Sequence, residues 1–465
     1  MRLTLADVIQ ATGGRAQGVP PGTEVIITGV STDTRTLRPG DLFVPLQGPR
    51  RDGHEYIGEA FDKGSVASLV TRPLDRVPGP IVRVDNMLQA LAGLARHYRS
   101  TLGVRVVGIT GSVGKTTTTA MCAAVLGTVY TVARTADEWN AEIGVPLAIL
   151  ALTPRTDVAV IEMAMRGLGQ IAELVQIASP AIGVLTNIGD SHRELLGTVE
   201  NIIRAKGELI EGLPADGRAV LNADDDRVMG LARRSRAPIL TYGVDRPADV
   251  TAEGVAFTPA GMRCRVRRDD GAVDVTLPTW GVHNVRNALA AAAVARVMDV
   301  GLDDVRRGLE RYQPPKMRLQ PVQAGDVLII NDAYNASPAS MSAAVDVLRQ
   351  LARGRRRVLV LGEMKELGAG AETAHHFVGA EAATAADILV TVGGRDAAEL
   401  GNGAAGAMPP ERIYHVPSPM RAIELLETLL QSGDIVLVKG SRALEMERVV
   451  AAIVAGRPRQ GHVEA

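Results

Sequence analysis

Short apolar runs alternate with amphipathic stretches along most of the 465-residue chain. Beyond residue 103, several runs have the length and composition of buried strands: VRVVGIT, DVAVIEM, AIGVLTNIG, GRAVLNAD and PILTYG. Stretches with helical periodicity separate several of them. Strands that alternate with helices favour a mostly parallel sheet that helices cover on both faces. The pattern therefore predicts an α/β fold.

The first hundred residues follow a different pattern. EVIITGVSTDTR and DLFVPLQG are typical of strands that run into loops, and GHEYIGEAFDKG is typical of a helix. The segment ends in NMLQALAGLARHYRS, whose apolar residues recur at helical spacing. We expect a small α/β domain over residues 1–100.

A third pattern begins after Pro314 and Pro315, where two prolines interrupt the chain. Five apolar runs then alternate with helix-like stretches: DVLIINDA, RRVLVLGEM, ADILVTVGG, RIYHV and DIVLVKG. This predicts a Rossmann-like open sheet of about five strands. Because a chain of this length exceeds one ordinary core, we predict domains over residues 1–100, 101–313 and 314–465, with a hinge near 314–318.

Composition narrows the class of protein. The formal net charge of -1 argues against a general nucleic-acid binder, which would be basic. No stretch approaches the roughly 18 apolar residues of a membrane span, and the N-terminus lacks a signal pattern. Cys122 and Cys264 lie in different regions without metal-ligand spacing, so we expect packed, reduced thiols. These features predict a cytoplasmic protein that does not insert into membranes.

Lysine is rare, since 45 of the 51 basic residues are arginines. Positions that require a compact, reactive amine are expected to be over-represented among the remaining six, because arginine serves elsewhere. The six are Lys63, Lys115, Lys206, Lys316, Lys365 and Lys439.

The segment VVGITGSVGKTTTT, residues 106–119, carries the strongest sign of chemistry. A strand runs into a glycine-rich turn and then a helix, an arrangement whose N–H groups bind phosphates. Lys115 is placed to meet the terminal phosphates of ATP, and Thr116 to ligate Mg²⁺. Ile109 stands where the strict loop spacing has glycine, so this loop is a tighter variant. The predicted nucleotide-binding residues here are Thr110, Gly111, Ser112, Val113, Gly114, Lys115, Thr116 and Thr117.

Three further residues are candidates for the same site. Glu162 ends the run DVAVIEM, and ligands bind beyond the carboxyl ends of parallel strands, so Glu162 is a candidate metal ligand. His192 follows the next strand, although a surface role is the commoner one for a lone histidine. Lys206 lies on an amphipathic helix, where a solvated face is the ordinary interpretation. Neighbouring charged positions, however, use Arg204 and Glu208.

Several motifs stand in one order along the chain: GSVGKTT, NAEIGVPL, VIEM, NIGDSH, IIRAKGE, GVHNVRNALAA and NDAYNASP. In this order they resemble the Mur ligases, which add amino acids to the peptide of peptidoglycan precursors. STDTRTLRPGDLFVPLQGPRRDGHEYI is similar to a UDP-binding domain of that family, so the resemblance covers nearly the whole chain. NAEIGVPLAIL, MRGLGQIAEL, LGEMKELG and VLVKGSR are closest to the branch that performs the last addition. The resemblance implies an ATP-dependent monomer that joins UDP-MurNAc-tripeptide to D-Ala-D-Ala through an acyl phosphate.

The resemblance also implies roles for individual residues. Lys115 and Thr116 would hold the β- and γ-phosphates and one Mg²⁺, with Glu162 as a further ligand. His192 would help to hold a second Mg²⁺, together with a carbamate formed from Lys206 and CO₂. Only a primary amine takes up CO₂ in this way. The implied catalytic residues are thus Lys115, Glu162, His192 and Lys206, and the implied metal ligands are Thr116, Glu162, His192 and carbamylated Lys206.

Other implied contacts concern the rest of ATP and the UDP sugar. Arg318 would reach the γ-phosphate from the last domain, and Asp332 would meet the ribose, with Tyr334 and Asn335 nearby. The implied adenine-side residues are His283, Asn284 and Asn287. The uridine-diphosphate pocket would include Ser31, Thr32, Asp33, Thr34, Arg35, Asp52, Gly53 and His54.

The chain departs from the family pattern at three places. Ala141 follows Asn140 where a second asparagine is usual, Ser337 replaces an asparagine, and Met317 precedes Arg318 where glycine is usual. The alternatives are a sister Mur ligase, a folylpolyglutamate synthase, which would lack the UDP-type first domain, and a non-ligase nucleotide-binding switch. A sister that adds diaminopimelate would be expected to carry an Asp-Asn-Pro-Arg motif in the last domain, and none is present.

Overall fold

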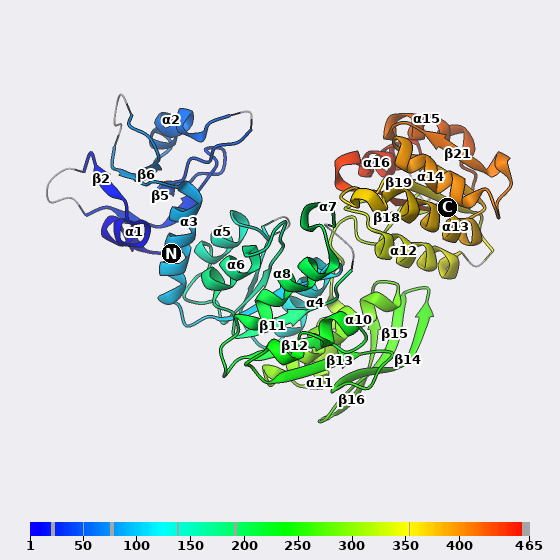
Figure 1. Ribbon diagram of the computed structural model, residues 1–465, viewed down its shortest axis with the longest axis horizontal. Helices are drawn as coiled ribbons and strands as arrows, with labels where there is room; N and C mark the ends of the chain where they lie inside the picture. The colour runs from blue at the N-terminus through cyan, green and yellow to red at the C-terminus, as the bar shows by residue number, and fades with distance from the viewer. Residues whose placement is uncertain are drawn as a thin grey trace, which may run out of the picture.

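The computed structural model describes residues 1–19, 24–49, 51–74, 79–136, 139–189, 193–352 and 354–457. Their strands form four sheets in three units that follow one another along the chain, with two sheets in the first unit and one in each of the others (Figure 1). Most strand pairs in the larger sheets are parallel, with helices between them. This confirms the predicted α/β class. Among the described residues, no helix combines the length and apolar character that a membrane crossing requires.

The first unit contains a five-stranded sheet of order β2-β7-β6-β5-β4, parallel except at β2. A separate pair, β1-β3, is antiparallel. The elements are β1 Leu3–Thr4, α1 Leu5–Thr12, β2 Arg15–Gln17, β3 Ile26–Ile27, β4 Gly29–Ser31, β5 Asp41–Phe43, a 3₁₀ helix at Gly53–Tyr56, α2 Ile57–Asp62, β6 Ala67–Val70, β7 Ile81–Arg83 and α3 Met87–Ser100.

The central unit has a nine-stranded sheet of order β16-β15-β14-β13-β12-β11-β8-β10-β9. Strands from β9 to β14 are parallel, whereas β14, β15 and β16 form an antiparallel extension that was not among the predicted strands. Helices α5, α6 and α8 cover one face, and α4, α10 and α11 cover the other. The elements are β8 Arg105–Thr110, α4 Lys115–Leu126, β9 Val132–Arg134, α5 Gly144–Leu150, β10 Val158–Glu162, α6 Gln170–Ala178, β11 Ile182–Leu185, α7 Arg193–Leu196, α8 Val199–Glu211, β12 Arg218–Asn222, α9 Asp226–Met229, β13 Ile239–Gly243, β14 Val250–Thr258, β15 Gly261–Arg268, β16 Gly271–Leu277, α10 Val282–Val297 and α11 Leu302–Arg311.

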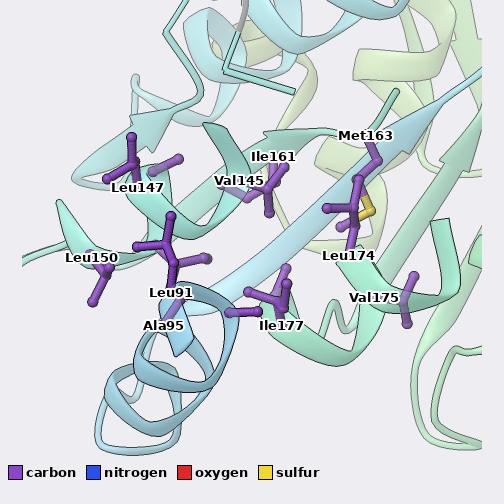
Figure 2. Packing of buried hydrophobic residues seen from close by; sticks show 14 of the residues in the cluster. Leu91, Ala95, Val145, Leu147, Leu150, Ile161, Met163, Leu174, Val175 and Ile177 are labelled. Atoms are coloured by element: carbon purple, nitrogen blue, oxygen red, sulfur yellow. The ribbon is translucent and has the colours of Figure 1, made fainter. Parts of the chain in front are cut away.

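Helix α3 belongs to the cores of the first two units at once. Its Leu91 belongs to the same apolar cluster as Val145 of α5 and Ile177 of α6 (Figure 2), and this cluster continues into the strands of the first unit. The Tyr98 hydroxyl donates to the Leu152 carbonyl at 2.8 Å, just beyond α5. Close-packed apolar contacts of α3 therefore hold the first unit to the central one.

The third unit has a six-stranded sheet of order β17-β18-β22-β19-β20-β21. Its five parallel strands match the predicted Rossmann-like sheet, and β17 adds an antiparallel edge. Helices α12, α13 and α14 pack on one face, and α15 and α16 on the other. The elements are β17 Gln320–Ala324, β18 Val327–Asp332, α12 Pro338–Leu351, β19 Arg357–Gly362, α13 Ala371–Ala385, β20 Ile388–Val392, α14 Arg395–Ala404, β21 Ile413–Val416, α15 Pro419–Leu429, β22 Ile435–Lys439 and α16 Glu447–Gly456.

Candidate active site

A tight loop joins β8 to α4 at the carboxyl edge of the central sheet. Gly111 and Gly114 have φ values of +152° and +86°, which residues with a side chain rarely adopt. A Cβ atom on Gly111 would lie 1.9 Å from Thr186 Oγ1, and one on Gly114 would lie 2.6 Å from Asn287 Oδ1. The loop therefore needs glycine at both positions, for backbone conformation and for space.

Two lysine side chains meet at this loop. The Nζ atoms of Lys115 and Lys206 each donate to the Gly111 carbonyl oxygen at 2.9 Å. Lys206, on α8, is 2% exposed, and its burial and the neighbouring charge of Lys115 hold its pKa well below the usual value. Burial also lowers the pKa of Lys115; Glu162 opposes this shift and Arg318 adds to it. These effects favour a neutral amine at Lys206.

Glu162 supplies a carboxylate near Lys115, whose pKa it raises. It ends β10, is buried, and accepts a hydrogen bond from Asn140 Nδ2 at 2.9 Å. A carboxylate and the Thr116 hydroxyl are hard oxygen donors of the kind Mg²⁺ prefers, so the residues present fit one such ion. His192 lies outside the described residues. Within the described ranges, no three His, Cys, Asp or Glu side chains gather to hold a metal ion.

The chain after β11 shapes the loop, a role that was not predicted. The Ser112 N–H donates to the Asn187 carbonyl at 2.9 Å, and the Val113 N–H donates to Asn187 Oδ1 at 2.9 Å. Asn187 lies in the motif NIGDSH, and its place shortly after a buried strand is the feature of the sequence that could have indicated this role. By contrast, the predicted Thr110 directs its hydroxyl to the Met163 carbonyl at 2.8 Å, which is a structural bond.

The start of α10 lies beside the same loop. Asn287 Oδ1 accepts from Thr118 Oγ1 at 3.2 Å, and its Nδ2 donates to Asn284 Oδ1 at 3.1 Å. Asn284 Nδ2 donates to the Trp280 carbonyl at 2.7 Å. The predicted adenine-side asparagines are thus buried and joined to each other. Both link the start of α10 to its surroundings.

Arg318 reaches the loop from the third unit. Its Nη2 donates to Thr116 Oγ1 at 3.1 Å, and its guanidinium carbon lies 4.2 Å from the centre of the Tyr334 ring. Met317 and Leu319, on either side, have φ values of +58° and +47°. Left-handed backbone at residues other than glycine costs about 1–3 kcal/mol each. Met317 therefore occupies a conformation that the glycine usual at this place would adopt without strain.

A lysine that was not assigned to the site anchors the nearby carboxylate. Lys439 ends β22, is buried, and donates to Asp332 Oδ2 at 2.7 Å and to the Asn335 carbonyl at 2.9 Å. The other carboxylate oxygen, Asp332 Oδ1, accepts from the Leu319 N–H at 3.0 Å. Burial lowers the pKa of His283 to about 4, while Asp332 opposes this shift. His283 at the start of α10 and Asp332 at the end of β18 are thus close enough to interact electrostatically.

The predicted uridine-diphosphate residues form a separate group in the first unit, after β4 and around the 3₁₀ helix. Arg35 pairs with Asp33 and lowers its pKa to about 2. Asp52 Oδ1 accepts from the His54 N–H at 3.0 Å and lies 2.7 Å from His54 Nδ1. His54 Nε2 accepts from the Thr71 N–H at 3.1 Å, so the ring proton lies on Nδ1. The chain after β4, β5 and β6 places residues 31–35, 52–54 and Thr71 at the carboxyl edge of these parallel strands.

Three family models match the chain. They are "Mur ligase family, catalytic domain" over residues 26–99, "Mur ligase middle domain" over 109–295 and "Mur ligase, glutamate ligase domain" over 317–442.

Relatives match over almost the full length. The UDP-N-acetylmuramoyl-tripeptide--D-alanyl-D-alanine ligase of Bacillus subtilis is 36% identical over 438 residues, which cover 94% of this chain and 95% of the relative. The crystal structure of MurF from Acinetobacter baumannii is similar with a TM-score of 0.88 and 30% identity, over 98% of this chain and 99% of that one. MurF from Thermotoga maritima, solved in complex with ADP, has a TM-score of 0.81 and 28% identity over 92% of this chain and 97% of that one. The phosphate loop and the paired lysines agree with these matches, which show that the chain belongs to the Mur ligase family.

Proposed function

We propose that this chain is an ATP-dependent ligase that adds D-Ala-D-Ala to UDP-MurNAc-tripeptide in the synthesis of peptidoglycan precursors. The B. subtilis relative carries this activity in its name. The observation that supports the proposal most directly is the meeting of Lys115, Lys206 and Glu162 at the phosphate loop. A nucleotide switch needs a phosphate loop, but it has no need of a second, buried lysine there.

The reaction activates a carboxylate before it forms the amide. The γ-phosphoryl group of ATP passes to the terminal carboxylate of the tripeptide, which gives an acyl phosphate and ADP. The amine of the dipeptide then attacks the carbonyl carbon, the carbon–oxygen bond to phosphate breaks, and inorganic phosphate leaves. Two anions must meet in the first step, so fixed positive charge lowers the barrier. Lys115 and Arg318 supply that charge, and the first-turn N–H groups of α4 bind the phosphates.

Mg²⁺, held by Thr116 and Glu162, would add further positive charge at the same place. For the second ion we propose a carbamate on Lys206. The neutral amine adds CO₂ and loses one proton, so an uncharged side chain becomes an anion that attracts Lys115. Its two oxygens, with His192, are the additional donors that a second Mg²⁺ would need.

We assign the three units to three substrates, with domains at residues 1–100, 101–313 and 314–465. The first would bind the UDP moiety through Ser31–Arg35 and Asp52–His54. The adenosine would lie between the start of α10, with His283, Asn284 and Asn287, and the residues Asp332, Tyr334 and Asn335. The dipeptide would bind beyond β18, β22 and β19, where loops diverge to opposite faces of the third sheet.

The test is mass spectrometry of the product, with phosphate release, after incubation with Mg·ATP, UDP-MurNAc-tripeptide and D-Ala-D-Ala. We expect a new amide and phosphate release only when both substrates are present. Release without the dipeptide would indicate a switch or ATPase. Product with diaminopimelate or lysine and the shorter UDP-dipeptide would indicate a sister ligase, and product with folate and glutamate would indicate folylpolyglutamate synthase.

A further inference from the structure

The side chain of Asn187 uses both of its polar groups on one residue of the phosphate loop. Its Oδ1 accepts from the Val113 N–H at 2.9 Å, and its Nδ2 donates to the Val113 carbonyl at 2.8 Å. The Asn187 main-chain carbonyl accepts from the Ser112 N–H at 2.9 Å. These three bonds fix the peptide groups on both sides of Val113.

Asn187 is itself held firmly. Asn222, at the end of β12, donates to the Thr186 carbonyl at 2.8 Å. Asp225, the cap of α9, accepts from the Ile188 N–H at 2.8 Å. The residues on both sides of Asn187 are thus bonded to neighbouring elements of the central unit. A side chain supported in this way can impose its geometry on the loop.

The bonds to Asn187 also decide which N–H groups remain for a ligand. Those of Ser112 and Val113 already have acceptors within the protein, on Asn187. Those of Lys115 and Thr116 lie in the first turn of α4, where a helix offers them no acceptor. Phosphate oxygens would therefore meet the helix end and the Lys115 amine, while the preceding part of the loop is kept in place by Asn187.

We infer that Asn187 is a positioning residue for ATP, which shapes the phosphate loop before the nucleotide arrives. The inference rests on the proposed function, since it assumes that this loop binds ATP. A purely structural role would make Asn187 matter for folding but not selectively for nucleotide binding. The two roles differ in what they predict for variants.

The experiment compares Asn187→Ala and Asn187→Asp with the wild type, with Asn86→Ala as the control. Asn86 caps α3 and accepts from the Gln89 N–H at 3.0 Å, so its removal lowers stability away from the loop. Calorimetry measures MgADP binding, steady-state kinetics measures KM for ATP and for D-Ala-D-Ala, and thermal unfolding measures stability.

For Asn187→Ala we expect the Kd of MgADP to rise about 30-fold, the factor for two neutral hydrogen bonds. KM for ATP rises with it, and KM for the dipeptide stays within about twofold. Asn187→Asp keeps the shape and an acceptor for the Val113 N–H, but it loses the donor and adds a negative charge near the phosphates. Its affinity should fall further. Asn86→Ala should unfold at a lower temperature with unchanged MgADP affinity.

The inference is overturned if Asn187→Ala binds MgADP within about threefold of wild type, or if both KM values rise together. Should the alanine variant not fold, Asn187→Ser, which is small and uncharged, decides by the same criteria. A wild type that binds MgADP but forms no amide would reject the proposed ligase activity, and the MgADP comparison would still judge Asn187. A wild type that does not bind MgADP would overturn both.

Discussion

Replacing Lys206 with methionine tests whether the buried amine contributes to the stability of the protein or to catalysis. Methionine keeps an unbranched chain of similar length and removes only the polar end. The lost hydrogen bond to the Gly111 carbonyl is worth about 1 kcal/mol. Lys115 still donates to that carbonyl at 2.9 Å, so no buried acceptor is left without a partner. We expect the free energy of unfolding to stay within about 1 kcal/mol of wild type.

The effect on turnover should be far larger. If the Lys206 carbamate supports the charge that stabilises phosphoryl transfer, its removal costs about 3–4 kcal/mol of transition-state stabilisation, or about 10²–10³-fold in kcat. The assay is phosphate release with both substrates, beside urea unfolding of the same preparations. Lys206→Ala offers a matched variant, because acetate or propionate added to the assay can restore a carboxylate in the vacated space. Lys206→Met with turnover within fivefold of wild type would refute the carbamate.

Three further predictions concern the same site. Lys115→Met should fold normally but lower kcat at least about 10³-fold, because it removes the charge that meets the γ-phosphate. Phosphate release measures kcat and circular dichroism checks the fold; a near-normal kcat would contradict this prediction. Arg318→Ala removes the contact to Thr116 and should raise KM for ATP about tenfold. It should also abolish the compaction that we expect small-angle scattering to detect when an ATP analogue and the tripeptide substrate bind. Compaction equal to that of the wild type would argue against this role of Arg318. Burial lowers the pKa of His283 from an ordinary 6.5 to about 4. Between pH 6.5 and 4, His283 is therefore protonated in the unfolded chain and neutral in the folded protein. The free energy of unfolding falls as the pH falls through this range, by at most about 3 kcal/mol. His283→Gln should lack this part of the acid destabilisation in urea unfolding at pH 4 to 7, and an unchanged pH slope would show that His283 is not its source.

Local pattern was enough to place most elements of the fold. The predicted run VRVVGIT contains β8, and the amphipathic stretch before it contains α3, because strand and helix periodicity is written in neighbouring residues. The antiparallel extension β14–β16 was missed. The sequence also did not predict that α3 packs in the cores of both the first and the central unit. Leu91 has the pattern of an ordinary apolar helix residue, and its cluster with α5 and α6 is known only from the structure.

The phosphate loop could be predicted from neighbouring residues alone, because Gly111, Gly114 and Lys115 lie within five consecutive residues and their spacing sets the geometry of the loop. It also marked Lys206 through the scarcity of lysine. The folded arrangement was needed to find that Lys206, 95 residues from Gly111 along the chain, donates to the same Gly111 carbonyl as Lys115. It was also needed to find that Asn187 binds the backbone of Val113. Such contacts depend on strand order and helix packing, which local periodicity does not contain.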